Sequence, residues 1–241
     1  MKRFLLFGLI IIGTIPVNAQ KLYKKDLLNL EKNIYKDALA NQDLITAQVA
    51  AYHAYMLEGP KSSYRDSLAF LYFNQRNYVS CLNMADKILK DEEKLPILEL
   101  KAVSLENLQD LKNAIATYEK IFSQKKQAVV AYKLAELQER LKRSAEAYTT
   151  LTAGEKLAFP KNGYISFQGP KKRSVQKVPF KAAYYNLMAK TAYDLHNYDL
   201  ALKYYDKALE IFPDFYIAKQ NKQVISLLKE KLNSNVQKTK K

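Results

Sequence analysis

Residues 182–215 read AAYYNLMAKTAYDLHNYDLALKYYDKALEIFPDF, and their pattern is the strongest indication of the fold. Within each half of it, small or apolar residues are spaced three or four positions apart, which is the period of one face of an α-helix. They are Tyr185, Met188, Ala189, Ala192, Ala201, Tyr205 and Ala208. Pro213 cannot continue a helix interior, so we expect a helix to end just before it. The stretch therefore predicts two helices in succession.

A short turn separates these two helices. Leu195, His196 and Asn197 occupy it, and Asn197 can cap the second helix because its side-chain oxygen can accept from a free first-turn N–H group. Ala189 and Ala201 are small enough to let two antiparallel helices approach closely, while the tyrosines fill the wider gaps. The stretch therefore predicts a helix–turn–helix hairpin.

This arrangement resembles the tetratricopeptide repeat, a helix–turn–helix unit of about 34 residues. The residues that carry the resemblance are Tyr185, Met188, Ala189, Ala192, Ala201, Tyr205, Ala208 and Pro213. Tyr185 stands where the family usually has tryptophan, and Ala189 stands where it usually has glycine. The resemblance implies an all-α solenoid of stacked repeats whose work is to hold other molecules.

The same pattern recurs along the chain. The small residue of the second helix is found at Ala47, Cys81, Ala114, Ala147 and Ala201, at steps of 34, 33, 33 and 54 residues. The position that begins the second helix holds Asp43, Asn77, Asp110, Arg143 and Asn197, and four of these five residues can act as caps. We therefore predict four repeats within residues 20–160 and a fifth within residues 181–215. A capping helix over residues 216–233 and a frayed basic tail over residues 234–241 should follow.

Cys81 is the only cysteine, so the chain cannot form an intrachain disulfide. Its place in the repeat makes it a small residue at a tight helix crossing, which we favour over a reactive role.

The first nineteen residues have the pattern of a secretory signal peptide. Lys2 and Arg3 precede an apolar run over residues 4–12, and Val17, Asn18 and Ala19 supply small residues before a cut after Ala19. An uncleaved anchor is the alternative, but the apolar run is short for a membrane span, which needs about 20 residues. We expect an exported protein that is periplasmic or associated with the outer envelope of a bacterium.

The chain is strongly basic, with a formal net charge of +15. Removal of residues 1–19 would take away Lys2 and Arg3 and no acidic residue, which lowers the charge to +13. An exported basic protein can meet acidic proteins, anionic glycans or lipid headgroups. Charge that serves only solubility is the alternative, and we favour it slightly because the charge forms no single patch.

Residues 161–180 interrupt the repeat rhythm, and we predict a basic insertion loop there. Asn162 and Gly163 could form a tight hairpin turn, and residues 164–167 look like a strand, but a mobile surface loop fits the unequal flanks better. The basic residues expected to contact an acidic partner are Lys171, Lys172, Arg173 and Lys177. A tolerated spacer with solvated charges is the equal alternative. Deletion of residues 161–178 should leave folding intact but weaken capture of the partner.

The resemblance also implies where a partner would bind. In this family the repeats stack into a right-handed superhelix, and the first helix of each repeat lines the concave side. The positions that correspond to this groove, and that we select as contacts, are Lys32, Lys36, Phe70, Phe73, Asn74, Asn107, Tyr132, Lys190 and Tyr193. Phe70 and Phe73 are the leading candidates because exposed aromatic side chains make good anchors, although Phe70 could pack on a neighbouring helix instead. The family's carboxylate-clamping pattern of lysines and asparagines is incomplete here.

The sequence gives little support for catalysis. His53 and His196 are the only histidines, and no metal-ligand spacing, glycine-rich phosphate loop or nucleophile motif is present. We expect no cofactor, no nucleic acid partner and at most peripheral membrane contact. The favoured hypothesis is a non-enzymatic scaffold of the bacterial cell envelope that holds a protein or peptide partner. The alternatives are a basic adaptor for polyanions or anionic headgroups, and a helper of a separate enzyme or transporter.

Overall fold

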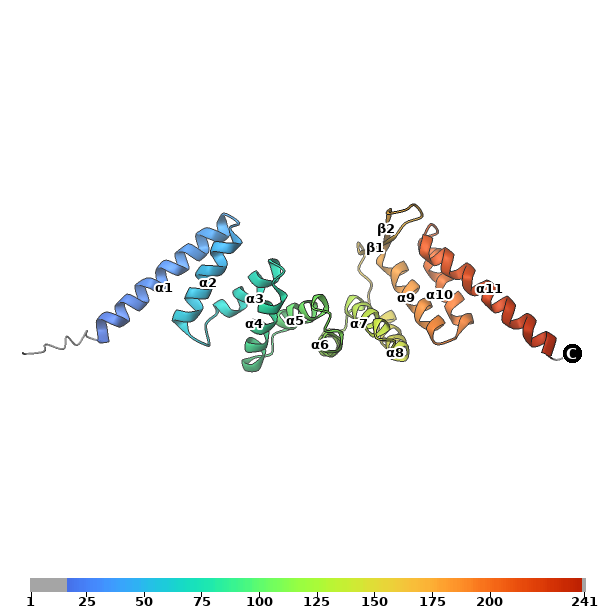
Figure 1. Ribbon diagram of the computed structural model, residues 1–241, viewed down its shortest axis with the longest axis horizontal. Helices are drawn as coiled ribbons and strands as arrows, with labels where there is room; N and C mark the ends of the chain where they lie inside the picture. The colour runs from blue at the N-terminus through green and yellow to red at the C-terminus, as the bar shows by residue number, and fades with distance from the viewer. Residues whose placement is uncertain (1–16, 240–241) are drawn as a thin grey trace, which may run out of the picture. The chain divides into compact units, whose positions relative to one another are not determined.

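A computed structural model describes residues 17–239, which contain eleven helices and one two-stranded sheet (Figure 1). The predicted signal peptide therefore lies outside the described residues except for its last three positions. The chain divides into two compact units, one ending at Glu93 and the other beginning at Lys94. Each unit is a succession of helix–turn–helix pairs, so the predicted all-α solenoid class is confirmed.

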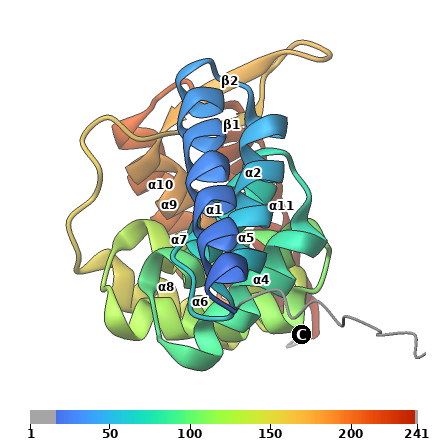
Figure 2. The same cartoon turned by 90° about the vertical axis from the view of Figure 1, so that its left-hand side faces the viewer.

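The N-terminal unit contains two such pairs. Its helices are α1 (Val17–Ala40), α2 (Leu44–Glu58), α3 (Tyr64–Asn74) and α4 (Tyr78–Asp91). Each helix packs on the next, and α1 and α2 run side by side in both views (Figures 1 and 2).

The C-terminal unit contains three pairs and a final helix. Its helices are α5 (Leu95–Asn107), α6 (Leu111–Gln124), α7 (Ala128–Arg140), α8 (Ser144–Glu155), α9 (Phe180–Asp194), α10 (Tyr198–Ile211) and α11 (Tyr216–Thr239). The final helix α11 packs on α10, as expected of a helix that covers the end of a stack.

All five helix pairs use one turn geometry. In each pair, the residue just before the N-cap position of the second helix adopts the left-handed backbone conformation, with φ between 58° and 61°. These residues are Gln42, Arg76, Gln109, Lys142 and His196. Four predicted caps are confirmed, because a side-chain oxygen accepts from the N–H group three residues on, at 3.0–3.3 Å. These caps are Asp43, Asn77, Asp110 and Asn197. Arg143 makes no such bond, as its chemistry predicts.

The small residues at the helix crossings are fully buried. Ala47, Cys81, Ala114, Ala147 and Ala201 are each 0% exposed. The explanation of Cys81 as a packing residue is confirmed. A side chain with more atoms at these positions would force each pair of helices apart.

The prediction of a mobile basic loop is wrong, because most of the insertion is an ordered β-hairpin. Strand β1 (Tyr164–Gln168) pairs antiparallel with β2 (Val175–Pro179), and the reversal lies between them rather than at Asn162 and Gly163. Phe167 packs edge-on against Phe215, with ring centroids 4.9 Å apart. Val178 is completely buried. The alternating apolar positions hold the hairpin on the helices, and Phe180 already belongs to α9.

Two helix boundaries also differ from the prediction. Helix α11 continues to Thr239, so residues 234–239 are helical rather than frayed. No glycine or proline follows Pro213, so nothing in the sequence stops this helix. Helix α1 begins at Val17, ahead of residue 20, where we predicted the first repeat to begin.

Candidate functional site

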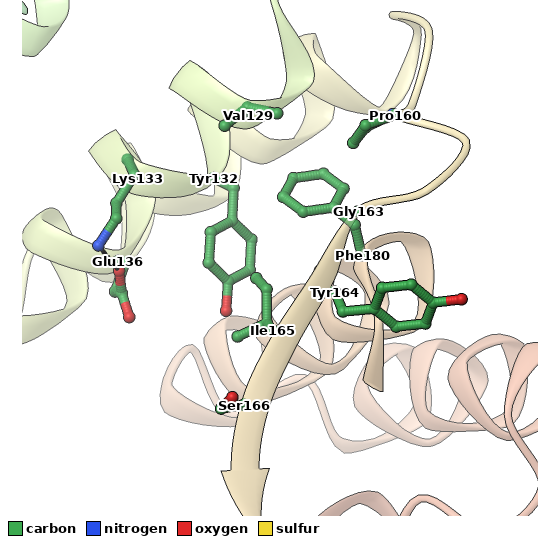
Figure 3. Close-up of a pocket in the computed structure, with 10 residues that line it drawn as sticks. All are labelled: Val129, Tyr132, Lys133, Glu136, Pro160, Gly163, Tyr164, Ile165, Ser166 and Phe180. Atoms are coloured by element: carbon green, nitrogen blue, oxygen red, sulfur yellow. Dashed lines mark hydrogen bonds and ion pairs between the residues drawn. The ribbon is translucent and has the colours of Figure 1, made fainter. Parts of the chain in front are cut away.

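The C-terminal unit contains a cleft of about 520 Å³ between α7 and the segment that enters β1 (Figure 3). Its lining residues are Val129, Tyr132, Lys133, Glu136, Pro160, Gly163, Tyr164, Ile165, Ser166 and Phe180. Tyr132 and Ile165 both project into the space between α7 and β1 (Figure 3). The cleft therefore has a helix as one wall and a strand as the other.

Gly163 brings the strand wall into place. A Cβ atom at this position would lie 2.8 Å from Cγ of Pro160 and 3.1 Å from Cβ of Phe180. The Phe180 N–H group donates to the Gly163 carbonyl at 2.7 Å. Only glycine allows this close approach, and the hydrogen bond ties the start of β1 to the start of α9.

Aromatic rings form the apolar floor of the cleft. Tyr132 is only 6% exposed, and its ring centroid lies 5.4 Å from that of Phe180 and 6.1 Å from that of Tyr184. Burial, assisted by the charge of Glu136, raises the pKa of the Tyr132 hydroxyl. The phenol therefore stays protonated and can donate a hydrogen bond.

One lysine shared by two carboxylates marks the polar side of the cleft. Lys133 Nζ lies 3.1 Å from Glu136 Oε2 and 3.2 Å from Glu106 Oε1. Burial alone would lower the pKa of the Lys133 ammonium, but the charges and hydrogen bonds of Glu136 and Glu106 outweigh burial and raise it. Two carboxylates and one ammonium leave this group with an excess negative charge.

A second cleft of about 300 Å³ lies between α9 and the final helix. It is lined by Lys190, Tyr193, Asp194, Tyr205, Asn221, Val224 and Ile225. Lys190 Nζ lies 2.7 Å from Glu139 Oε2 and 2.6 Å from Asp194 Oδ2. Burial opposes the charge of Lys190, but its two hydrogen-bonded carboxylates raise its pKa above the ordinary value. A lysine held between two carboxylates therefore occurs in both clefts.

The predicted groove residues of the C-terminal unit do not line a single site. Tyr132 lies in the larger cleft, whereas Lys190 and Tyr193 line the smaller one. Asn107 is exposed near the end of α5, where its Nδ2 donates to the Val103 carbonyl at 2.8 Å. Tyr132 is mainly a core residue, so it offers a partner only its small exposed edge.

The other five groove candidates belong to the N-terminal unit. Lys32 forms an ion pair with Glu58 at 2.7 Å, while Lys36 and Asn74 are exposed. Phe70 is 55% exposed, so it does not pack fully against a neighbouring helix. Phe73 is half-buried and meets the Tyr78 ring edge-on, with centroids 5.9 Å apart.

The four basic candidates of the insertion lie on the hairpin. Lys171, Lys172 and Arg173 are exposed in the loop that joins β1 to β2, and Lys177 is exposed on β2. They do not line either cleft.

Sequence reasoning missed most of the cleft residues that come from outside α7. Pro160, Gly163, Ile165 and Phe180 were not among the candidates, because a loop gave no reason to place them beside α7. The strand-like pattern of residues 164–167 was the available signal.

The described residues show neither a metal centre nor a membrane span. Across residues 17–239, no group of three or more His, Cys, Asp or Glu side chains could hold a metal ion. In the same range, no helix is both long and apolar enough to cross a membrane.

Comparison with known protein families identifies the type of repeat. Models of the tetratricopeptide repeat match residues 182–215 and residues 95–127. These segments are the α9–α10 and α5–α6 pairs, and the turn and crossing residues described above recur in the other pairs. The chain is a tetratricopeptide-repeat protein. Repeats of this kind serve as protein-binding scaffolds, and the two matches support that role here.

Solved structures share the fold at low sequence identity. One is YrrB, described as a TPR protein with an unusual peptide-binding site, at 15% identity and a TM-score of 0.64, covering 86% of this chain and 98% of YrrB. A MamA protein matches at 13% identity and a TM-score of 0.60, over 77% and 92% of the two chains. MamA from Desulfovibrio magneticus RS-1 matches at 14% identity and a TM-score of 0.59, over 79% and 98%. No curated protein sequence matches the chain.

Proposed function

We propose that this protein is a non-enzymatic scaffold that binds a peptide segment of a partner protein in the cleft between α7 and β1. The observation that carries the proposal is the cleft itself. Its volume of about 520 Å³ is within the range of ligand-binding sites, and it combines an aromatic floor with a charged side. The solved structure of YrrB, which has the same fold, is described as having a peptide-binding site.

The walls of the cleft favour a peptide over a compact small molecule. One wall is formed by residues 163–166 and the other by α7 side chains between residues 129 and 136, and both β1 and α7 continue beyond the cleft. An extended segment can follow both walls, whereas a small molecule would use only part of them.

We also propose that the protein is exported and works in a bacterial cell envelope. The support is the charged, apolar and small-residue pattern of residues 1–19. N-terminal sequencing of the protein from native cells tests this, because a mature chain that begins at Gln20 is expected. A chain that keeps residues 1–19 would contradict signal cleavage.

Selection from a phage-displayed library of short linear peptides tests the cleft. Wild-type protein should select peptides from the library. The Val129→Trp variant should bind these peptides at least about tenfold more weakly, because the added ring would fill the cleft. Val79→Trp is the matched control, since Val79 is an exposed valine in the other unit. Val224→Trp blocks the smaller cleft instead. Peptides that bind Val129→Trp as well as they bind wild type would contradict the proposal.

A second candidate function is attachment to a polyanion. Its support is the exposed group of Lys171, Lys172 and Arg173 at one end of the hairpin. Heparin binding that weakens steeply from low to moderate salt, and that is lost when all three become alanine, would support it. Binding that ignores these three residues would remove this candidate.

A further inference from the structure

The two edges of the hairpin differ in their capacity to accept another strand. The Phe180 N–H donates to Gly163 O, and the Gly169 N–H donates to Ser174 O, at the two ends of the ladder. Antiparallel pairing alternates, so the odd-numbered residues between Gly163 and Gly169 bond to β2. The main-chain N–H and C=O groups of Tyr164, Ser166 and Gln168 therefore point away from β2, along the open edge of β1.

The cleft lies at this open edge. It is lined by the consecutive residues Gly163, Tyr164, Ile165 and Ser166. Side chains alternate between the two faces of a strand, so a cleft that touches successive residues meets the strand along its edge. Figure 3 shows β1 running beside α7 with no other strand between them. Within residues 17–239 the sheet has only β1 and β2, so this edge has no strand partner.

The opposite edge of the hairpin is blocked. On β2 the residues whose main-chain groups point outward are Val175, Lys177 and Pro179, which pair with Gln168, Ser166 and Tyr164. Proline has no N–H group to donate, and lysine and proline are the residues with which proteins protect exposed strand edges. The edge of β1 carries neither residue type. The hairpin is therefore closed to strand addition on one side and open on the side that faces the cleft.

The side chains around the open edge specify the chemistry of the occupant. Val129, Tyr132 and Phe180 would receive apolar side chains. Glu136 shares Lys133 with Glu106, so one carboxylate there lacks a full counter-charge. A cationic side chain satisfies this excess, whereas an acidic one would be repelled.

We propose that the bound segment is an extended peptide of a partner protein that adds to the edge of β1 as a third strand, with apolar side chains on the aromatic floor and a lysine or arginine at Glu136. This inference rests on the proposed function, because it specifies how the same cleft binds. Main-chain pairing supplies affinity, and the floor and Glu136 supply selectivity.

Hydrogen exchange measured by NMR on the wild-type protein tests the main-chain pairing. The probes are peptides selected from the phage-displayed library. Bound peptide should slow exchange of the Tyr164 and Ser166 amides at least about tenfold, while Ile165 and Phe167, already paired with β2, change little. Peptides that need Val129 but leave the Tyr164 and Ser166 amides unprotected would overturn strand addition and leave the proposed function standing.

Proline substitution provides a second test. Ser166→Pro removes an N–H group that points into the cleft and should weaken peptide binding at least about tenfold. Val175→Pro is the matched control, because it removes an outward N–H from the opposite edge of the hairpin. It should bind within about twofold of wild type. Equal losses in the two variants would overturn the proposal, and the exchange test decides the matter if Ser166→Pro does not fold.

The charge preference has its own readout. Selected peptides should be enriched in lysine and arginine, and Glu136→Gln should weaken their binding about threefold or more. Enrichment in aspartate and glutamate would overturn the assignment of the occupant's chemistry. A library that yields no binder at all would overturn the proposed function itself.

Discussion

The two units of this protein use the same turns and crossing residues but fill their cores differently. Among the described residues, the buried side chains of the N-terminal unit are aliphatic or small, with alanines along α2 and no buried aromatic ring. The C-terminal unit buries eight aromatic side chains: Tyr118, Tyr132, Phe180, Tyr184, Tyr185, Tyr204, Tyr205 and Phe215. One repeat pattern therefore supports two kinds of core.

The difference extends to the surface. In the N-terminal unit, α2 has alanines on its buried side and an exposed apolar stripe on the other, formed by Ile45, Val49, Tyr52 and Met56. In the C-terminal unit, the aromatic core extends to the hairpin through Phe167 and to the cleft through Tyr132 and Phe180. The larger core therefore fixes the inserted hairpin and shapes the candidate binding site.

Removal of the Tyr184 side chain should produce the largest difference in stability between the two units. Tyr184 is fully buried, and its hydroxyl donates to the Leu151 carbonyl at 2.7 Å. Tyr184→Ala should lower the free energy of unfolding of the C-terminal unit by about 3–5 kcal/mol, because it leaves a cavity and a lost hydrogen bond. Hydrogen exchange in urea, followed unit by unit, measures this. Tyr52→Ala, at an exposed site, is the control, and equal loss in both units would show that the cores are not independent.

Loss of the Phe167 side chain, which packs the hairpin against the helices, should have the next largest effect on stability. The sequence alone predicted that residues 161–178 could be deleted with folding intact. Phe167 packs on Phe215, however, and the Gln176 side chain donates to Asp214 O and accepts from the Tyr216 N–H. Phe167→Ala should destabilise the C-terminal unit by about 2–3 kcal/mol. Urea denaturation measures the change, with exposed Val175→Ala as control. An unchanged midpoint would restore the view of the insertion as a spacer.

High pH should weaken the aromatic unit more than the aliphatic one. Burial raises the pKa of Tyr205 to about 12, and burial also raises the pKa of Tyr132 and Tyr184. A raised folded-state pKa gives stability that is complete below the unfolded value of about 10 and is lost as pH rises through the folded value. Tyr205 alone should account for a loss on the order of 2 kcal/mol. Tyrosinate absorbance and unfolding followed from about pH 9 to about pH 12 measure it, and Tyr205→Phe should reduce the loss. Equal alkaline sensitivity of the two units would contradict this.

The helix caps should give the smallest effects and show what the units share. Asn77→Ala and Asn197→Ala remove the same bond from the same turn, at 3.2 Å and 3.1 Å, in different units. Each should cost about 1 kcal/mol in its own unit. Arg143→Asn supplies the one missing cap and should gain up to about 1 kcal/mol. Thermal unfolding measures all three, and unequal losses at the two asparagines would mean that the turns are not equivalent.

Local features were predictable from the sequence because each depends on neighbours along the chain. The turn residues cap through their own side chains, and the step of 33 or 34 residues repeats the same pairing of small residues. Helix type, turn position and the burial of Ala47, Cys81 and Ala201 followed from the spacing and the types of the residues.

The candidate site was not predictable in the same way, because its walls come from segments distant in sequence. Val129 and Ile165 line one cleft because Gly163 lies close against Pro160 and Phe180, and because Phe167 packs on Phe215 and so holds the hairpin in place. The same attachment explains why residues 164–168, which were predicted to lie in a loop, form a strand. The repeats could be predicted from the sequence, since helices and caps depend on residues close together along the chain. Tertiary packing decided which strand edge stays open, since that depends on which faces of the hairpin the aromatic core covers.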